Sequence, residues 1–206
     1  MLRVALLDDH PAVLAGLRRL IEPEPDMTVV AAEREPSQLD SLLDRARPDV
    51  LVLDHDLSHA DGLALCLRVK RRADPPAVVV YSAYASPALA LAARVAGADA
   101  LVDKAAPVRQ LVNAIRRAAQ GLKSLPRTPR DAYAAAIERI ADEDLPILAM
   151  LLDGATITET ALALRSDPGA VAWRAQRIVG RLCPGLRQRP AEHAHGAGHI
   201  APSSRT

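Results

Sequence analysis

One apolar run that ends in an acid, Val50 to Asp54, constrains the fold of this chain more than any other segment. Four apolar residues in succession, two of them β-branched, predict a strand that is buried on both faces. The residues from 55 to 62 are polar and end in a glycine, so we expect the chain to turn directly after Asp54. A carboxylate in that position is held at the edge of a core, where its neighbours are fixed.

A short apolar strand followed by an amphipathic helix recurs five times in the first 120 residues. The expected strands are 2–7, 28–32, 50–54, 77–81 and 99–103, and the expected helices are 11–21, 36–46, 61–72, 87–96 and 107–120. This alternation predicts an α/β fold, a doubly wound five-stranded parallel sheet with helices on both faces. In such a sheet the functional site lies at the carboxyl ends of the strands.

Polar side chains stand at four of these strand ends: Asp8 and Asp9, Asp54, Ser82 and Lys104. We expect them to converge in one crevice, where carboxylate oxygens suit Mg²⁺ or Mn²⁺. A carboxylate can also attack phosphorus and form an aspartyl phosphate. Phosphoryl transfer then requires that the oxygens be neutralised, which a metal ion, a lysine and a hydroxyl can do together. The pattern therefore predicts a phosphoryl-acceptor site.

Composition excludes some classes of function. The chain has 206 residues, half of them apolar, and a net charge of +1, so any nucleic-acid site must be local. Cys66 and Cys183 lack metal-ligand spacing and are expected to be free thiols. No apolar run approaches the roughly 18 residues of a membrane span, and the chain enters a strand pattern at once without a signal peptide. We therefore expect a cytoplasmic protein.

The pattern becomes purely helical after residue 130. Two prolines and no apolar periodicity predict a linker at 122–130, and the composition of 190–206 predicts a disordered tail. Between them, 131–189 is expected to form a small all-α domain with helices at 131–141, 143–152, 156–164 and 167–182. Between Pro168 and Ala191 the chain carries five arginines and no acid, which favours a surface for DNA phosphates and bases.

The strand-end residues together with the string Leu6-Leu7-Asp8-Asp9-His10-Pro11 resemble the receiver domain of two-component response regulators over residues 1–121. They resemble in particular the NarL/FixJ-like variant, in which the receiver is fused to a LuxR-type helix-turn-helix domain. The resemblance implies the strand order 2-1-3-4-5. It also implies that a sensor histidine kinase phosphorylates Asp54, and that Ser82 is the switch hydroxyl beside Lys104. The implied Mg²⁺ ligands are the side chains of Asp8, Asp9 and Asp54 and the backbone carbonyl of Asp56.

Residues 143–183 resemble the LuxR-type helix-turn-helix itself, with 167–182 as the recognition helix. The expected DNA contacts lie on that helix and are Trp173, Arg174, Gln176, Arg177 and Arg181. The resemblance implies promoter DNA and RNA polymerase as partners, and a homodimer that forms on phosphorylation. The expected function is thus a transcriptional response regulator rather than an enzyme.

Two alternatives remain open at this point. Leu101 stands three residues before Lys104, where the family usually has Tyr or Phe, so the chain could be an atypical receiver that works through protein contacts without phosphorylation. The sequence Asp54-His55-Asp56 is also the Asp-x-Asp of haloacid-dehalogenase-type phosphatases. His55 and His59 flank the site and are expected to be exposed loop residues.

Overall fold

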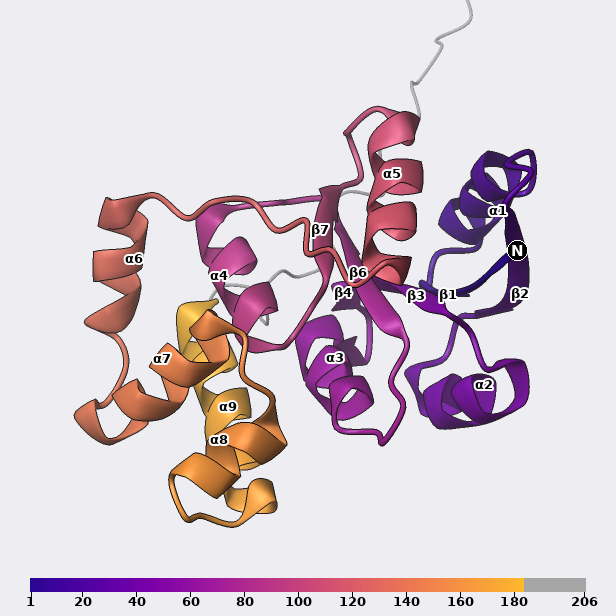
Figure 1. Ribbon diagram of the computed structural model, residues 1–206. Coiled ribbons are helices and arrows are strands. Elements are labelled where there is room, and N and C mark those ends of the chain that lie inside the picture. The colour runs from indigo at the N-terminus through magenta and orange to yellow at the C-terminus, as the bar shows by residue number, and fades with distance from the viewer. Residues whose placement is uncertain (184–206) are drawn as a thin grey trace, which may run out of the picture.

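The computed structural model describes residues 1–183, and its first part is built on a five-stranded parallel sheet (Figure 1). The strands lie in the order β2-β1-β3-β6-β7, which is the order 2-1-3-4-5 implied by the resemblance. Their bounds are β1 (Leu2–Leu7), β2 (Met27–Glu33), β3 (Val50–Asp54), β6 (Ala77–Ser82) and β7 (Ala100–Asp103). The predicted α/β doubly wound fold is confirmed.

Helices cover both faces of this sheet (Figure 1). They are α1 (Pro11–Ile21), α2 (Leu39–Ala46), α3 (Gly62–Lys70), α4 (Pro87–Val95) and α5 (Val108–Ala119), with a 3-10 turn η1 (Pro36–Gln38) before α2. Within β3, Val50 and Val52 pack with α1 and α5, whereas Leu51 and Leu53 pack with α2, α3 and α4. The strand is therefore buried on both faces, as its unbroken apolar run predicts.

A two-stranded antiparallel hairpin, β4 (Asp56–Leu57) and β5 (Ala60–Asp61), follows β3 directly and was not predicted. Its strands are too short to leave a periodic signal. The hairpin ends at Gly62, where a Cβ atom would lie 2.2 Å from the Asp54 carbonyl oxygen and 2.6 Å from the His55 Cα. Only glycine fits so close to this backbone, so the return of the chain beside Asp54 depends on that residue.

The second part of the chain is helical, and the helix-turn-helix expected at its end is present as α8 and α9. Its elements are α6 (Arg130–Ile137), η2 (Asp142–Asp144), α7 (Leu145–Asp153), α8 (Ile157–Ala163) and α9 (Pro168–Leu182). Thr156 and Glu159 form a capping box at the start of α8, and the Asp167 side chain caps α9. Between the two helices, Arg165 has φ of 51°, the left-handed conformation that glycine adopts more easily.

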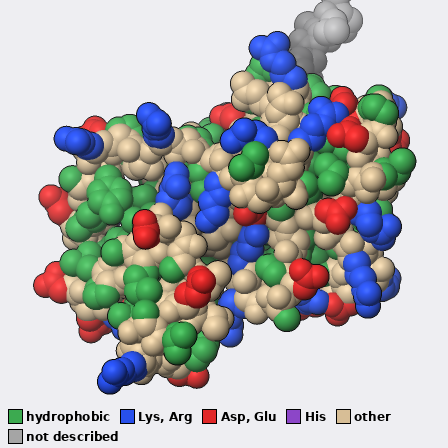
Figure 2. Space-filling view, in the orientation of Figure 1, with side chains coloured by type: hydrophobic (Ala, Val, Ile, Leu, Met, Phe, Trp, Pro, Cys, Tyr) green, Lys and Arg blue, Asp and Glu red, His purple; other side chains and the backbone are tan. Residues whose placement is uncertain are grey.

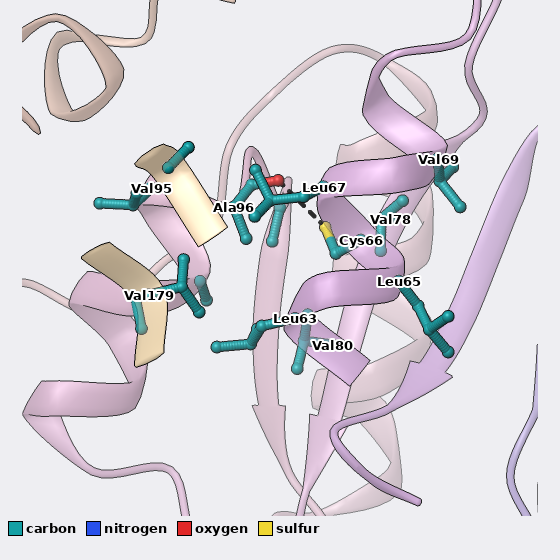
Figure 3. Packing of buried hydrophobic residues seen from close by; sticks show 14 of the residues in the cluster. Leu63, Leu65, Cys66, Leu67, Val69, Val78, Val80, Val95, Ala96 and Val179 are labelled. Atoms are coloured by element: carbon teal, nitrogen blue, oxygen red, sulfur yellow. Dashed lines mark hydrogen bonds between the residues drawn. The ribbon is translucent and has the colours of Figure 1, made fainter. Parts of the chain in front are cut away.

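The helical part packs against the sheet part through α4 and α3. Helix α4 is buried along nearly its whole length, because the sheet covers one side and α6, α7 and α9 cover the other. Figure 3 shows Leu63 of α3, Val95 of α4 and Val179 of α9 in one apolar cluster. One continuous core therefore joins the two parts of the chain.

Both cysteines are free thiols, as predicted. Cys66 is fully buried and its Sγ donates to the carbonyl oxygen of Ala96 at 3.4 Å (Figure 3). Burial raises the pKa of each thiol to about 12, so neither is a thiolate at neutral pH. On the face shown in Figure 2, acidic and basic side chains are interspersed, in keeping with a net charge near zero.

Candidate functional site

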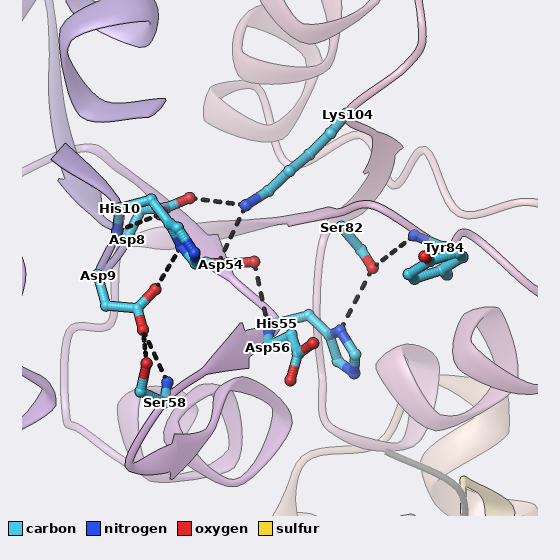
Figure 4. A network of polar contacts seen from close by, with 10 residues as sticks. All are labelled: Asp8, Asp9, His10, Asp54, His55, Asp56, Ser58, Ser82, Tyr84 and Lys104. Atoms are coloured by element: carbon cyan, nitrogen blue, oxygen red, sulfur yellow. Dashed lines mark hydrogen bonds and ion pairs between the residues drawn. The ribbon is translucent and has the colours of Figure 1, made fainter. Parts of the chain in front are cut away.

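Asp54, at the carboxyl end of β3, is 3% exposed and lies beside the polar ends of two neighbouring strands (Figure 4). The Lys104 Nζ lies 2.8 Å from Asp8 Oδ2 and 3.0 Å from Asp54 Oδ2, so a single ammonium group bridges the two buried carboxylates. The backbone N–H of Asp56 donates to Asp54 Oδ1 at 3.3 Å. The parallel register of the sheet thus brings together side chains that are far apart in sequence.

Asp9 forms the outer wall of the same crevice. The Ser58 N–H donates to Asp9 Oδ2 at 2.8 Å, and the Ser58 hydroxyl donates to the same oxygen. Asp9 Oδ1 is buried and makes no well-aligned hydrogen bond, while the His10 Nδ1 lies 2.7 Å away. Burial works to raise the pKa of Asp9, but the hydrogen bonds from Ser58 and the charge of His10 hold it below its usual value. Asp9 is therefore an anion at neutral pH.

Negative charge exceeds positive charge in this crevice. One oxygen from each of Asp8, Asp9 and Asp54, and a ring nitrogen of His10, lie within 4.8 Å of one another. Burial raises the pKa of Asp54 to about 6, with Lys104 opposing and Asp8 reinforcing the shift. Three carboxylates whose oxygens converge beside a single lysine fit a hard divalent cation held by oxygen ligands.

Ser82 ends β6 on the other side of Asp54 and is buried. Its Oγ accepts the N–H of Tyr84 at 3.1 Å and lies 3.3 Å from the Nδ1 of His55 (Figure 4). The sequence therefore placed Ser82 correctly at the edge of the crevice, but it gave no sign of the histidine contact.

The prediction that His55 is exposed was wrong, because its side chain is only 4% exposed. The residue extends β3 by one position, since its N–H donates to the Tyr81 carbonyl of β6 at 3.2 Å. The hairpin and Gly62 then close over its backbone. Burial lowers the pKa of His55, so the ring is neutral at pH 7. His59, at the tip of the hairpin, is exposed as expected.

The residues expected to contact DNA all lie on α9, but they differ in their surroundings. Trp173 is 59% exposed and Gln176 is also exposed, whereas the guanidinium of Arg177 stacks 4.6 Å from the Trp173 ring. Arg174 Nε lies 2.6 Å from Asp144 Oδ1, and Arg177 and Arg181 lie 3.5 and 3.6 Å from its Oδ2.

Asp144 is fully buried at the start of α7, and no local sequence pattern marks it as the partner of these arginines. Their own helix offers Arg174, Arg177 and Arg181 no acidic partner, because Asp144 lies about thirty residues earlier in the chain. The signal that could have found it is the spacing of 174, 177 and 181, which puts the three side chains on one face of α9. Arg187, Arg189 and the histidines of the predicted tail lie outside the described residues.

Residues 4–116 match the family model of the response regulator receiver domain, which is more than half of the chain. The chain belongs to the response regulator receiver family. The site residues Asp8, Asp9, Asp54, Ser82 and Lys104 all fall within the matched segment.

Full-length relatives show which type of response regulator this is. The chain is 24% identical over 205 residues to the transcriptional regulatory protein LiaR of Bacillus subtilis, covering 95% of this chain and 97% of the relative. It is 30% identical to the DNA-binding transcriptional activator DevR/DosR of Mycobacterium tuberculosis, covering 81% and 75%. A crystal structure of a LuxR-family response regulator from Aurantimonas superimposes with a TM-score of 0.58 at 30% identity, covering 68% and 99%.

The protein is therefore a response regulator of the NarL/LuxR type, as its strand-end residues suggested. The two full-length relatives named above are transcription regulators rather than enzymes. Among residues 1–183, no helix combines the length and the apolarity that a membrane crossing requires.

Proposed function

We propose that Asp54 is the phosphoacceptor of this response regulator and that its phosphorylation controls transcription through α9. The observation that carries the proposal is the buried Asp54 carboxylate, bridged by Lys104 to Asp8 at 3.0 and 2.8 Å. One lysine holds the acceptor oxygen in a defined position and provides a positive charge for incoming phosphoryl oxygens.

Phosphoryl transfer at this site would use the residues as follows. An Asp54 carboxylate oxygen attacks the phosphorus of a phosphohistidine on a sensor kinase, a P–O bond forms, and the P–N bond breaks as the imidazole leaves. Lys104 already contacts Asp54 and can pass to a phosphoryl oxygen without a large movement. Ser82 supplies a hydroxyl for a second oxygen.

We propose that Asp8, Asp9, Asp54 and the backbone carbonyl of Asp56 hold Mg²⁺ in this site. The support is the excess of carboxylates over lysines and the convergence of one oxygen from each of Asp8, Asp9 and Asp54 within 4.8 Å. When bound, Mg²⁺ would supply positive charge for the phosphoryl oxygens. Ser58 positions Asp9 for that role through its N–H and hydroxyl.

Phosphorylation is tested by incubating the protein with acetyl phosphate and Mg²⁺ and measuring intact mass. We expect one phosphoryl adduct on wild type and on Asp74→Asn, a control at an exposed acid outside the site, and none on Asp54→Asn. Adducts on Asp54→Asn in equal yield would contradict the assignment of the phosphoacceptor.

We further propose that promoter DNA is contacted by Trp173 and Gln176, with Arg174, Arg177 and Arg181 adding positive potential. The names of the relatives support a DNA-binding output, and the two side chains are exposed on α9. Ala172, by contrast, is buried in the core that joins α9 to α4. A DNA groove can therefore reach that face of α9 only after α9 separates from α4.

The domain plan that we propose is a receiver at 1–121, a linker at 122–130 and a DNA-binding domain at 131–189, with a tail at 190–206. The proposed partners are a sensor histidine kinase, promoter DNA and RNA polymerase, and the active form is a homodimer in the cytoplasm. Anisotropy with promoter fragments tests the output. We expect beryllofluoride to increase DNA affinity, and Gln176→Ala to reduce it while the exposed receiver residue Gln120→Ala leaves it unchanged.

A further inference from the structure

Two buried groups beside the phosphoacceptor share one hydrogen bond. The hydroxyl of Ser82 lies 3.3 Å from the Nδ1 of His55, and the two side chains are 1% and 4% exposed. Figure 4 shows the ring turned away from the Asp54 carboxylate and toward Ser82. The proposed phosphoryl transfer to Asp54 uses the Ser82 hydroxyl but gives His55 no role.

The number of protons on Ser82 limits what it can do. A serine hydroxyl has one proton to donate and two lone pairs that accept. The N–H of Tyr84 already donates to this oxygen at 3.1 Å. If the Ser82 proton is donated to His55, it is not available to a phosphoryl oxygen on Asp54. The two hydrogen bonds exclude each other.

We propose that His55 is a positioning residue that accepts a hydrogen bond from the Ser82 hydroxyl in the unphosphorylated protein and loses this hydrogen bond when Asp54 is phosphorylated. This inference rests on the proposed phosphorylation of Asp54. The resting protein then has Ser82 donating to His55 Nδ1, with the imidazole proton on Nε2. In the phosphorylated protein Ser82 donates to the phosphoryl group, and the buried neutral ring must move its proton from Nε2 to Nδ1 or rotate, because its Nδ1 has lost its partner.

The position of His55 suits it to pass this change on. The family usually has Tyr or Phe three residues before the lysine, and here that residue is the buried Leu101. An aromatic side chain at that position therefore cannot transmit the change in this protein. His55 accepts the N–H of Gly62 through its carbonyl at 3.0 Å, and Gly62 is the first residue of α3. Helix α3 packs against α9, so a change at His55 lies one helix away from the output helix.

A double-mutant cycle with beryllofluoride as the phosphoryl analogue tests this competition. His55→Leu frees the Ser82 proton, so we expect beryllofluoride to bind roughly 3- to 10-fold more tightly than to wild type, the range of one hydrogen bond. In a Ser82→Ala background, His55→Leu should have no effect. The matched control is His59→Leu. His59 is an exposed histidine in the turn between β4 and β5, and its replacement should leave binding unchanged.

The ring itself gives a second readout on the unmutated protein, which keeps the proposal testable if His55→Leu fails to fold. Nitrogen NMR of His55 should show an unprotonated Nδ1 before beryllofluoride and a changed Nδ1 signal after it. An equal effect of His55→Leu with and without Ser82, or a protonated Nδ1 in the resting protein, would overturn the proposal. If wild type takes up no beryllofluoride at all, it is the assignment of Asp54 that fails.

Discussion

Two buried aspartates, Asp54 in the receiver and Asp144 in the helical part, have opposite charge surroundings. Asp54 is 3% exposed and shares one lysine with a second buried acid, Asp8. Asp144 is 0% exposed and faces three arginines, with Arg174 at 2.6 Å. The first cluster has too few cations for its carboxylates, and the second has more than it needs.

This difference separates a reactive carboxylate from a structural one. Burial, reinforced by the neighbouring charge of Asp8, raises the pKa of Asp54 to about 6, and a cluster with this excess of carboxylates can gain a metal ion. Asp144 faces three guanidinium groups, and its ion pairs tie α9 to the start of α7. Burial of an acid alone therefore does not identify a functional site, whereas its charge balance does.

The largest difference between the two aspartates should appear in stability. Asp144→Asn leaves three guanidinium groups close together without their anion, so we expect a loss of about 2–3 kcal/mol, less than for a fully buried pair because the arginines are partly exposed. Asp54→Asn should leave stability unchanged or raise it at neutral pH. Urea denaturation of both variants measures this contrast, and equal losses would contradict it.

The pH dependence should carry the same distinction. The pKa of Asp54 is about 6 in the folded protein and about 3.9 in an unfolded chain, so the native state binds more protons between these values. Its contribution to stability is therefore complete below about pH 4 and is lost as pH rises through about 6, by an amount on the order of 3 kcal/mol. Without Mg²⁺, wild type should lose stability relative to Asp54→Asn over this window. If the difference in unfolding free energy between wild type and Asp54→Asn stays constant between about pH 4 and pH 7, the pKa of Asp54 is not raised in the folded protein.

Removing one cation from each cluster should give a smaller contrast. Lys104→Met takes away the ammonium group that Asp8 and Asp54 share, and we expect a loss of about 1–2 kcal/mol at pH 8. Arg181→Met leaves two arginines on Asp144, so the loss should be below about 0.5 kcal/mol. Thermal unfolding at low salt compares the two, and a larger effect of Arg181→Met would reverse the account.

How far the sequence could predict the site depends on the range of each signal. Asp9, Asp54, Ser82 and Lys104 each end a strand with a clear apolar run, and parallel strands bring their carboxyl ends together, so the convergence could be predicted. The departure of Leu101 from the family pattern can also be read directly from the sequence. Each of these signals can be read from a single strand, and the parallel sheet then brings the strand ends together.

The contacts that were missed depend on pairs of residues without a shared periodic pattern. His55 looked like a loop residue, but the short hairpin and the close return at Gly62 bury it. The arginines of α9 looked unpaired because Asp144 lies in another helix. In both cases tertiary packing set the surroundings of a charged or titratable group, and no local propensity encodes that packing.

The central claim is that the Asp54 cluster lacks positive charge, and Mg²⁺ binding measured by titration calorimetry at pH 7.5 tests it most directly. Wild type should bind one ion, Asp9→Asn should bind it at least about tenfold more weakly through the loss of a carboxylate ligand, and Asp142→Asn, an exposed acid near Asp144, should bind like wild type. No saturable binding to wild type, or equal binding by Asp9→Asn, would contradict the account.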